Sequence, residues 1–482
     1  MCKIVTVPGD ASWGEVIELC TGPASVAQPP ADADIAAQPH ADADIADEPP
    51  CPGYAFWLSR YYGLEFTDES DDWPAKRIFE AFEADIAVAE DSYFDVDYRS
   101  EFAKIQESTF AASEPDTIRL HFFQGQRPAE GVGIHGYLTY VEECISATRE
   151  LIALSQRAAS AGESPITVSP DCEPVTRYKG YAILRTSSPT IGRTMVHPDC
   201  HNDSLPEGDT LANHIRTSVA EEVTVFGVPL RAIGVPFMQQ DGNLLRCAHV
   251  TAWMSHYTAV LRGYVPRRAS GHFASASGVP SSYGRAYPAD GIPALEQIRI
   301  LIDAGLPPDA IQIDRLMAER ELGWHDRPAL HERLRDAASP CENKKHKRQR
   351  QETGRQCRCA EQAVTRAWFV ENLVATVCRY LNSGLPVILN IDDHSRLICG
   401  YLRDLDLEGS GDAASKEVSA FIFHDDETGP YIVQSIEDLL DEIDDDGTAS
   451  FSVLTPLPTG LWLGDLAAEI AAVELLKSLA SD

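Results

Sequence analysis

The second half of the chain places a cysteine at the predicted start of a helix. Cys247 follows a polar turn at 239–246, and the apolar spacing of residues 247–261 predicts a helix that begins at the cysteine. The dipole and the first N–H groups of a helix N-terminus favour a thiolate. Cys247 is therefore a candidate nucleophile, and the alternative interpretation is a structural cysteine that fills a small apolar space.

A histidine and a carboxylate follow in chain order, each beside an apolar strand. His394 opens a predicted strand after a polar turn, and Asp425 ends a later one. If the three side chains share one groove, Cys247 can attack a carbonyl, His394 can relay the proton and Asp425 can accept from the imidazole Nδ1–H. Gln240, upstream of the cysteine, is the candidate amide donor to the oxyanion. Taken singly, such a histidine or acidic turn is more often without a catalytic role.

The order of these residues resembles the papain-like cysteine peptidase superfamily, and within it the peptidase C39-like group. In that group a cysteine begins the central helix, a histidine opens a strand that ends in Gly-Tyr (here Gly400-Tyr401), and an aspartate follows the next strand. The resemblance covers roughly residues 236–435. It implies a central helix packed on an antiparallel sheet and catalytic roles for Cys247, His394 and Asp425, with Gln240 one residue further upstream than the family spacing.

The function implied by this resemblance is hydrolysis of a peptide or amide bond in a protein or peptide substrate, with no cofactor and no metal. Two alternatives stay open. The same scaffold can serve as a catalytically inactive papain-like binding module, or as a transglutaminase-like acyltransferase. Product analysis with and without an added amine would separate hydrolysis from transfer.

Composition divides the chain into three parts, and the expected fold class is α+β. Residues 1–52 contain a repeated Ala-Asp-Ala-Asp-Ile-Ala tract with too little apolar surface to fold, which predicts a disordered segment. Residues 53–235 predict an α+β domain of unknown role, and residues 236–482 the papain-like domain with a basic insertion near 341–358.

Apolar periodicity and turn residues predict the elements of the two domains. Helices are expected at 73–90, 247–261, 292–304, 363–381 and 466–479, and strands at 117–123, 180–185, 191–196, 222–228, 231–235, 386–391, 396–402 and 421–423. The acidic run 441–446 is expected to be a solvated loop. Arg185 and Arg193, on predicted strands, are interpreted as paired surface arginines with a structural role, and anion binding is the alternative.

Charge and hydropathy exclude several classes of partner. The chain has 482 residues with 40 Lys+Arg against 74 Asp+Glu, and the net charge of −34 argues against nucleic-acid binding and against docking on anionic lipid. No apolar run approaches the roughly 18 to 20 residues of a membrane helix, and the N-terminus lacks the pattern of a signal peptide. We therefore expect a cytoplasmic protein, and the sequence does not indicate its oligomeric state.

The cysteines do not form a disulfide framework or a convincing metal site. The 12 cysteines are scattered along a chain too long to need disulfide bonds, which favours reduced thiols. Cys357 and Cys359, with Cys341 and His346 nearby, depart from the paired spacing of zinc sites and lie in a basic segment. That basic segment is interpreted as a disordered insertion, able to contact an acidic partner or the acidic surface of the protein itself.

Overall fold

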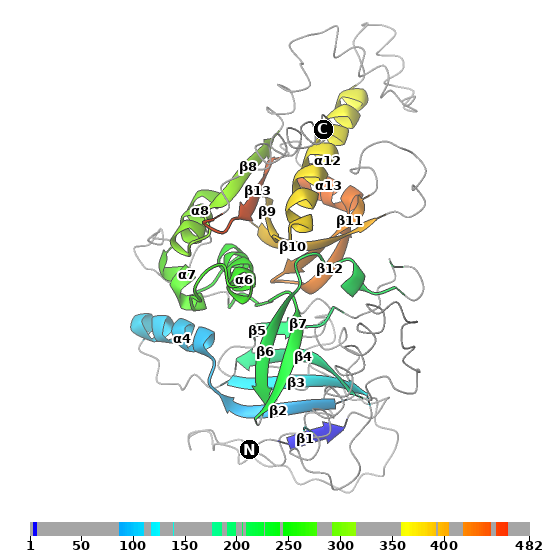
Figure 1. Cartoon of the computed structure of the whole chain (residues 1–482). Coiled ribbons are helices and arrows are strands. Elements are labelled where there is room, and N and C mark those ends of the chain that lie inside the picture. The colour runs from blue at the N-terminus through cyan, green and yellow to red at the C-terminus, as the bar shows by residue number, and fades with distance from the viewer. Residues whose placement is uncertain are drawn as a thin grey trace, which may run out of the picture. The chain divides into compact units, whose positions relative to one another are not determined.

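The structure is a computed structural model of the whole chain (Figure 1). It describes residues 3–6, 86–109, 117–125, 138, 176–185, 190–198, 205, 209–225, 227–241, 244–276, 292–314, 358–391, 394–403, 418–444 and 450–460. These residues form helices and antiparallel sheets, which confirms the α+β class. Most of the predicted disordered segment, nearly all of the basic insertion and the predicted helix at 466–479 lie outside the described residues.

The chain divides into two compact units. The first comprises Met1–Arg99, Ala112–Cys200 and Ala220–Ile233, and the second comprises Ser100–Ala111, His201–Val219 and Gly234–Asp482. The main change of unit falls at residues 233–234, close to the boundary expected at 235–236. The second unit also takes up two segments that the sequence analysis placed in the first domain.

The first unit is built on a five-stranded antiparallel sheet in the order β1-β2-β3-β4-β5. Its strands are β1 (Lys3–Thr6), β2 (Ile86–Tyr93), β3 (Thr117–Gly125), β4 (Thr176–Arg185) and β5 (Ile191–Val196). β6 (Val219–Val225) pairs with β7 (Val228–Gly234), where buried and exposed residues alternate as expected of a strand with one buried face. Helix α4 (Val96–Thr109) spans the boundary of the two units.

Arg185 and Arg193 of the first unit are buried, which corrects the expectation of surface residues. Arg185 is fully buried and Arg193 is 5% exposed. Arg193 forms ion pairs with Glu221 at 2.7 Å, Asp95 at 3.3 Å and Asp97 at 3.7 Å. A buried charge needs such partners because it has lost its water shell. These contacts support the structural role over the alternative of anion binding.

The second unit contains a six-stranded antiparallel sheet in the order β12-β11-β10-β9-β13-β8. Its strands are β8 (Pro308–Asp314), β9 (Val387–Ile391), β10 (His394–Arg403), β11 (Val418–Asp425), β12 (Gly429–Ser435) and β13 (Ser450–Pro456). Its helices are η2 (Leu211–Asn213), α6 (Cys247–Leu261), α7 (Ser270–Ala276), α8 (Ala294–Asp303), α12 (Arg358–Asn382) and α13 (Ile436–Asp444).

The sheet lies between two layers of helices (Figure 1). Successive side chains of a strand point to opposite faces, so each central strand contacts both layers. In β9, Val387, Leu389 and Ile391 join the apolar core formed with α12 and α13. The intervening Asn390 faces the other layer, where it bonds to Gln297 of α8. Helix α6 lies in that second layer and contacts β9 and β10. The alternation therefore places polar side chains of the sheet beside the start of α6.

Gly400 in β10 is required by a close approach of the backbone. A Cβ atom at this position would lie 2.5 Å from the carbonyl oxygen of His214, because β10 forms a bridge with Ile215 there. The glycine of the Gly-Tyr pair thus allows the segment 214–216 to pack directly on the strand.

Several predicted elements are confirmed, and the structure departs from three predictions. The helices at 247–261, 292–304 and 363–381 are present as α6, α8 and α12. The end of the predicted helix 73–90 is strand β2, which pairs with both β1 and β3. Residues 441–444 of the acidic run form the last turn of α13, a helix whose Ile436, Leu439 and Leu440 pack in the core of the sheet. Strand β1 also lies within the segment expected to be disordered. Within the described residues, no helix combines the length and the apolar character needed to cross a membrane.

Candidate active site

Cys247 is the first residue of α6, and the turn before it is held by side-chain bonds. The Asp241 Oδ1 atom accepts hydrogen bonds from the backbone N–H groups of Leu244 and Leu245, each at 2.8 Å. Arg246 precedes the helix with an extended backbone and donates its N–H to His249 Nδ1 at 3.1 Å. The side chains that follow in α6 are buried, whereas Cys247 is half-buried. The thiol therefore lies where the helix meets the surface of the unit.

His394 and Asp425 face each other across the neighbouring strands β10 and β11. The His394 Nε2 atom lies 3.2 Å from Asp425 Oδ2. The Asp425 Oδ1 atom accepts backbone N–H bonds from Glu427 at 2.9 Å and Thr428 at 3.3 Å, so the carboxylate is fixed by its own turn. The Cys247 side chain also acts on the imidazole, because it helps to raise the pKa of His394. Chain order predicted a contact from Nδ1 to the carboxylate, whereas Nε2 makes this contact.

The surroundings of His394 favour its protonated form. Burial by itself lowers the pKa of the imidazole, but the bonds to Asp425 and Cys247 and the negative charges of Asp425 and Asp426 outweigh it and raise the pKa to about 11. For Asp425, burial raises the pKa, and the bond and charge of His394 reverse this and hold it below its usual value. The geometry thus supports an imidazolium held between a thiol and a carboxylate.

Asp426, the next residue in the chain, is buried, and its charge state differs from that of Asp425. Burial raises its pKa to about 8, with the charges of Asp425 and Glu427 adding to the effect and His394 opposing it. Among the described residues, neither of its carboxylate oxygens has a hydrogen-bond partner. Asp426 is therefore protonated near neutral pH, while Asp425 carries the charge that faces the histidine.

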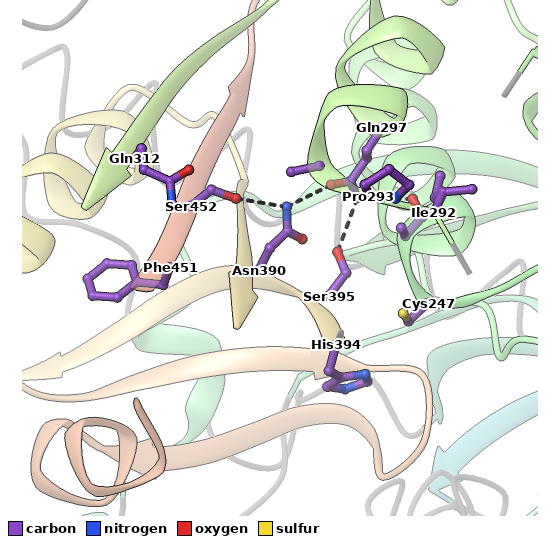
Figure 2. A pocket seen from close by; sticks show the side chains of 12 residues that line it. Cys247, Ile292, Pro293, Gln297, Gln312, Asn390, His394, Ser395, Phe451 and Ser452 are labelled. Carbon is purple, nitrogen blue, oxygen red and sulfur yellow. Dashed lines mark hydrogen bonds between the residues drawn. The ribbon is translucent and has the colours of Figure 1, made fainter. Parts of the chain in front are cut away.

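A cavity of about 230 Å³ adjoins the thiol and the imidazole (Figure 2). It is lined by the starts of two helices and by the polar faces of the central strands. The lining residues are Cys247, Ala248, Ile292, Pro293, Ala294, Gln297, Gln312, Asn390, His394, Ser395, Phe451 and Ser452. A substrate carbonyl placed in this cavity would meet the sulfur beside the N-terminus of α6, where the first backbone N–H groups of a helix point outward.

A polar network missed by the sequence analysis supports the cavity. The Gln297 Nε2 atom donates to the Ala248 carbonyl and to Thr251 Oγ1, both at 3.0 Å, and lies 3.1 Å from Ser395 Oγ. Thr251 Oγ1 and Ser395 Oγ are 2.9 Å apart and share a hydrogen bond. These bonds join α6, α8 and β10 next to Cys247 and His394. The available signal was Asn390, a polar residue inside an apolar strand, which calls for a polar partner.

The structure brings three of the four predicted site residues together. Cys247 and His394 line the cavity, and Asp425 pairs with the histidine. Gln240 contacts the turn that follows Asp425, because its Nε2 atom donates to Glu427 Oε1 at 3.4 Å. It is not one of the residues that line the cavity. In this arrangement the backbone N–H groups at the start of α6, rather than the Gln240 amide, are the donors beside the sulfur.

The same residues contain a possible cation site. Ligand atoms of His394, Asp425 and Asp426 lie within 4.8 Å of one another. One imidazole and two carboxylates suit a divalent ion such as zinc. His394 and Asp425 would thus belong both to this cation site and to the imidazole–carboxylate pair.

Comparisons with known proteins return no relative. No protein-family model, no curated protein and no solved structure matches this chain. Function is therefore inferred from the geometry of the site and from its chemistry.

Proposed function

We propose that the second unit is a cysteine hydrolase of the papain-like type, which cleaves a peptide or amide bond through Cys247, His394 and Asp425. The observation that supports this most is the position of His394. Its Nε2 atom is 3.2 Å from Asp425 Oδ2, the Cys247 side chain helps to raise its pKa, and Cys247 and His394 line the same cavity. The alternative interpretation of Cys247 as a structural residue does not account for this arrangement.

The proposed reaction begins with attack of the Cys247 sulfur, as a thiolate whose proton His394 holds, on the substrate carbonyl carbon. The carbonyl oxygen becomes an oxyanion, which the N–H groups at the start of α6 stabilise. His394 gives its proton to the amine nitrogen, the C–N bond breaks and the amine leaves. The products of this step are the free amine and a thioester between the acyl group and Cys247.

Hydrolysis of the thioester restores the enzyme. Neutral His394 takes a proton from a water molecule, whose oxygen attacks the thioester carbonyl. The C–S bond then breaks, which releases a carboxylic acid and regenerates the sulfur beside a protonated imidazole. Asp425 holds the ring in place through Nε2 in both steps and stabilises its positive charge.

The test uses the full chain and a library of fluorogenic peptide amides. We expect turnover that Cys247→Ala reduces by about 10³-fold or more, with little change in melting temperature because Cys247 is half-buried at the start of its helix. Cys378→Ala, at another half-buried cysteine, is the matched control and should keep its activity. Turnover that survives Cys247→Ala would contradict the proposal, and so would the absence of turnover together with an unreactive Cys247.

Product analysis identifies the acceptor of the acyl group. Mass spectrometry of the products in water should show the carboxylic acid. If an added primary amine becomes the main acceptor even at low concentration, the protein is an acyltransferase rather than a hydrolase.

A further inference from the structure

We infer that the cavity beside Cys247 is a subsite for a neutral hydrogen-bond-donating side chain of the substrate, with a carboxamide (glutamine or asparagine) as the matching group and Asn390 Oδ1 as its acceptor. This inference rests on the proposed function, because it names the substrate class of the same site. Three observations carry it: the orientation of two amide side chains, one buried acceptor, and a described lining that is uncharged apart from Cys247 and His394.

The orientation of Gln297 is fixed by a backbone carbonyl. Its Nε2 atom lies 3.0 Å from the carbonyl oxygen of Ala248, which can only accept a hydrogen bond. The nitrogen of the amide must therefore face Ala248. The oxygen, Oε1, in consequence faces Asn390 and requires a donor there.

The orientation of Asn390 follows from that of Gln297. Its Nδ2 atom donates to Gln297 Oε1 at 2.9 Å and to Ser452 Oγ at 3.2 Å, so both amide hydrogens have acceptors. The remaining polar atom is Asn390 Oδ1, which is buried and has no hydrogen-bond partner within the described part of the chain. Figure 2 shows this oxygen on the side of the amide toward Ser395. A buried acceptor without a partner is unfavourable, and a donor from a ligand removes the penalty.

The lining of the cavity selects against charged groups. Apart from Cys247 and His394, the described lining consists of apolar residues and of the neutral polar side chains Gln297, Gln312, Asn390, Ser395 and Ser452. The lining offers no carboxylate to pair with a lysine or arginine of the substrate. A substrate carboxylate could reach only the histidine that catalysis requires. A charged side chain would therefore lose its water without gaining a partner.

The size and shape of the cavity fit one side chain. Its volume of about 230 Å³ is below the roughly 300 Å³ at which sites for drug-sized ligands begin. In Figure 2 the labelled polar side chains run from Gln312 and Ser452 through Asn390 and Ser395 to Cys247. Cys247 and Asn390 thus line the same cavity, which has room for the side chain of a substrate residue next to the scissile bond.

The test measures how fast electrophilic peptide probes label Cys247 in the full chain. The probes share one backbone and warhead, and the residue at each position beside the warhead is Gln, Glu, Lys or Leu. At one position we expect the Gln probe to label Cys247 at least about tenfold faster than the other three, because a buried polar site rejects analogues that lack its hydrogen bond. Equal rates at every position would overturn the inference.

Two variants locate the source of the preference. Asn390→Leu removes the acceptor at similar size, and we expect the Gln-to-Leu rate ratio to fall to about one or to reverse. Ser452→Ala removes one acceptor of the Asn390 amide, so Asn390 can then also donate a hydrogen bond to the substrate. The ratio of labelling rates for the Gln and Glu probes should therefore fall by about threefold or more. Each ratio is measured within one variant, so a general loss of rate does not affect it. Ser452→Ala keeps the test valid if Asn390→Leu does not fold.

The outcomes separate this inference from the proposed function. If no probe labels Cys247, the nucleophile is absent and both proposals fail. If all probes label Cys247 equally, or if both variants keep the wild-type ratios, the cysteine is reactive and only the subsite assignment is overturned.

Discussion

His394 Nε2 lies 3.2 Å from Asp425 Oδ2, on adjacent antiparallel strands of the same sheet. Because β10 and β11 are paired through their backbones, the relative position of the two side chains is set by the sheet. The carboxylate is held in turn by the N–H groups of Glu427 and Thr428. The imidazole is thus oriented before any substrate binds.

Replacement of Asp425 by asparagine should change the pH dependence of turnover. The bond and charge of Asp425 help to raise the pKa of His394 to about 11, so Asp425→Asn lowers that pKa and moves the alkaline limb of the kcat/KM profile to lower pH. We also expect kcat to fall by about tenfold or more. The measurement is kcat/KM between pH 5 and pH 10 with one peptide amide. An alkaline limb at the same pH in both proteins would show that Asp425 does not act on the imidazole.

The same pair affects stability in a defined direction. The pKa of His394 is raised above its usual 6.5, so its contribution to stability is complete below about pH 6.5 and is lost as the pH rises through about 11. Asp425→Asn should therefore lower the melting temperature at pH 7 more than at pH 10.5. An equal loss at both values would contradict this linkage.

Asp426 should lower the stability of the protein as the pH rises. Its pKa is raised from 3.8 to about 8, so the folded state keeps a proton that the unfolded chain has lost, and stability falls from about pH 4 to about pH 8. Asp426→Asn removes this fall and should stabilise the protein at pH 8 by an amount on the order of 2 kcal/mol, with a smaller effect at pH 4.5. Denaturant unfolding at the two pH values measures the difference.

Glu427→Gln is the matched control for Asp426→Asn. It removes an acid from the same turn, but Glu427 is exposed to solvent. We expect its effect on the free energy of unfolding to stay within about 0.5 kcal/mol at both pH values. If the two substitutions behave alike, the burial of Asp426 is not the cause.

The buried ion pairs of Arg193 should be required for the stability of the first unit. Arg193→Met leaves Asp95, Asp97 and Glu221 without their shared cation, and loss of one partner of a buried pair costs about 3–5 kcal/mol. The rate of amide hydrogen exchange in β4 and β5 measures the stability of this unit within the full chain. Arg231→Met, at an exposed position of β7, should leave exchange unchanged. Unaltered protection in Arg193→Met would show that the cluster contributes little.

The elements that carry the site could be predicted because each has a local signal. Cys247 begins an apolar helix, and His394 and Asp425 flank apolar strands, so the sequence indicates α6, β10 and β11 directly. Strand β2 was not predicted because its apolar residues also fit helical spacing, and its pairing with β1 joins segments about 80 residues apart. Such long-range pairing has no local signature in the sequence.

The details of the site depend on contacts that sequence spacing cannot give. The ring nitrogen that faces Asp425, the bond from Gln240 to Glu427 and the bonds of Gln297 all join residues from different elements. Gln297 lies in an amphipathic helix, where a glutamine is common on the exposed face, yet here it is fully buried. Only the packing of α8 against α6 brings it into the lining of the cavity.

The most direct test of the central claim is the rate at which iodoacetamide modifies Cys247 at pH 7, measured by peptide mapping. Cys378 is the internal reference, because burial raises its pKa to about 11 and keeps it a thiol. We predict that iodoacetamide modifies Cys247 at least about 100-fold faster than Cys378. His394→Ala should lower the rate of modification of Cys247 by at least about tenfold. A Cys247 that reacts no faster than Cys378, or that is unaffected by His394→Ala, would contradict the account of a thiol activated by an imidazole.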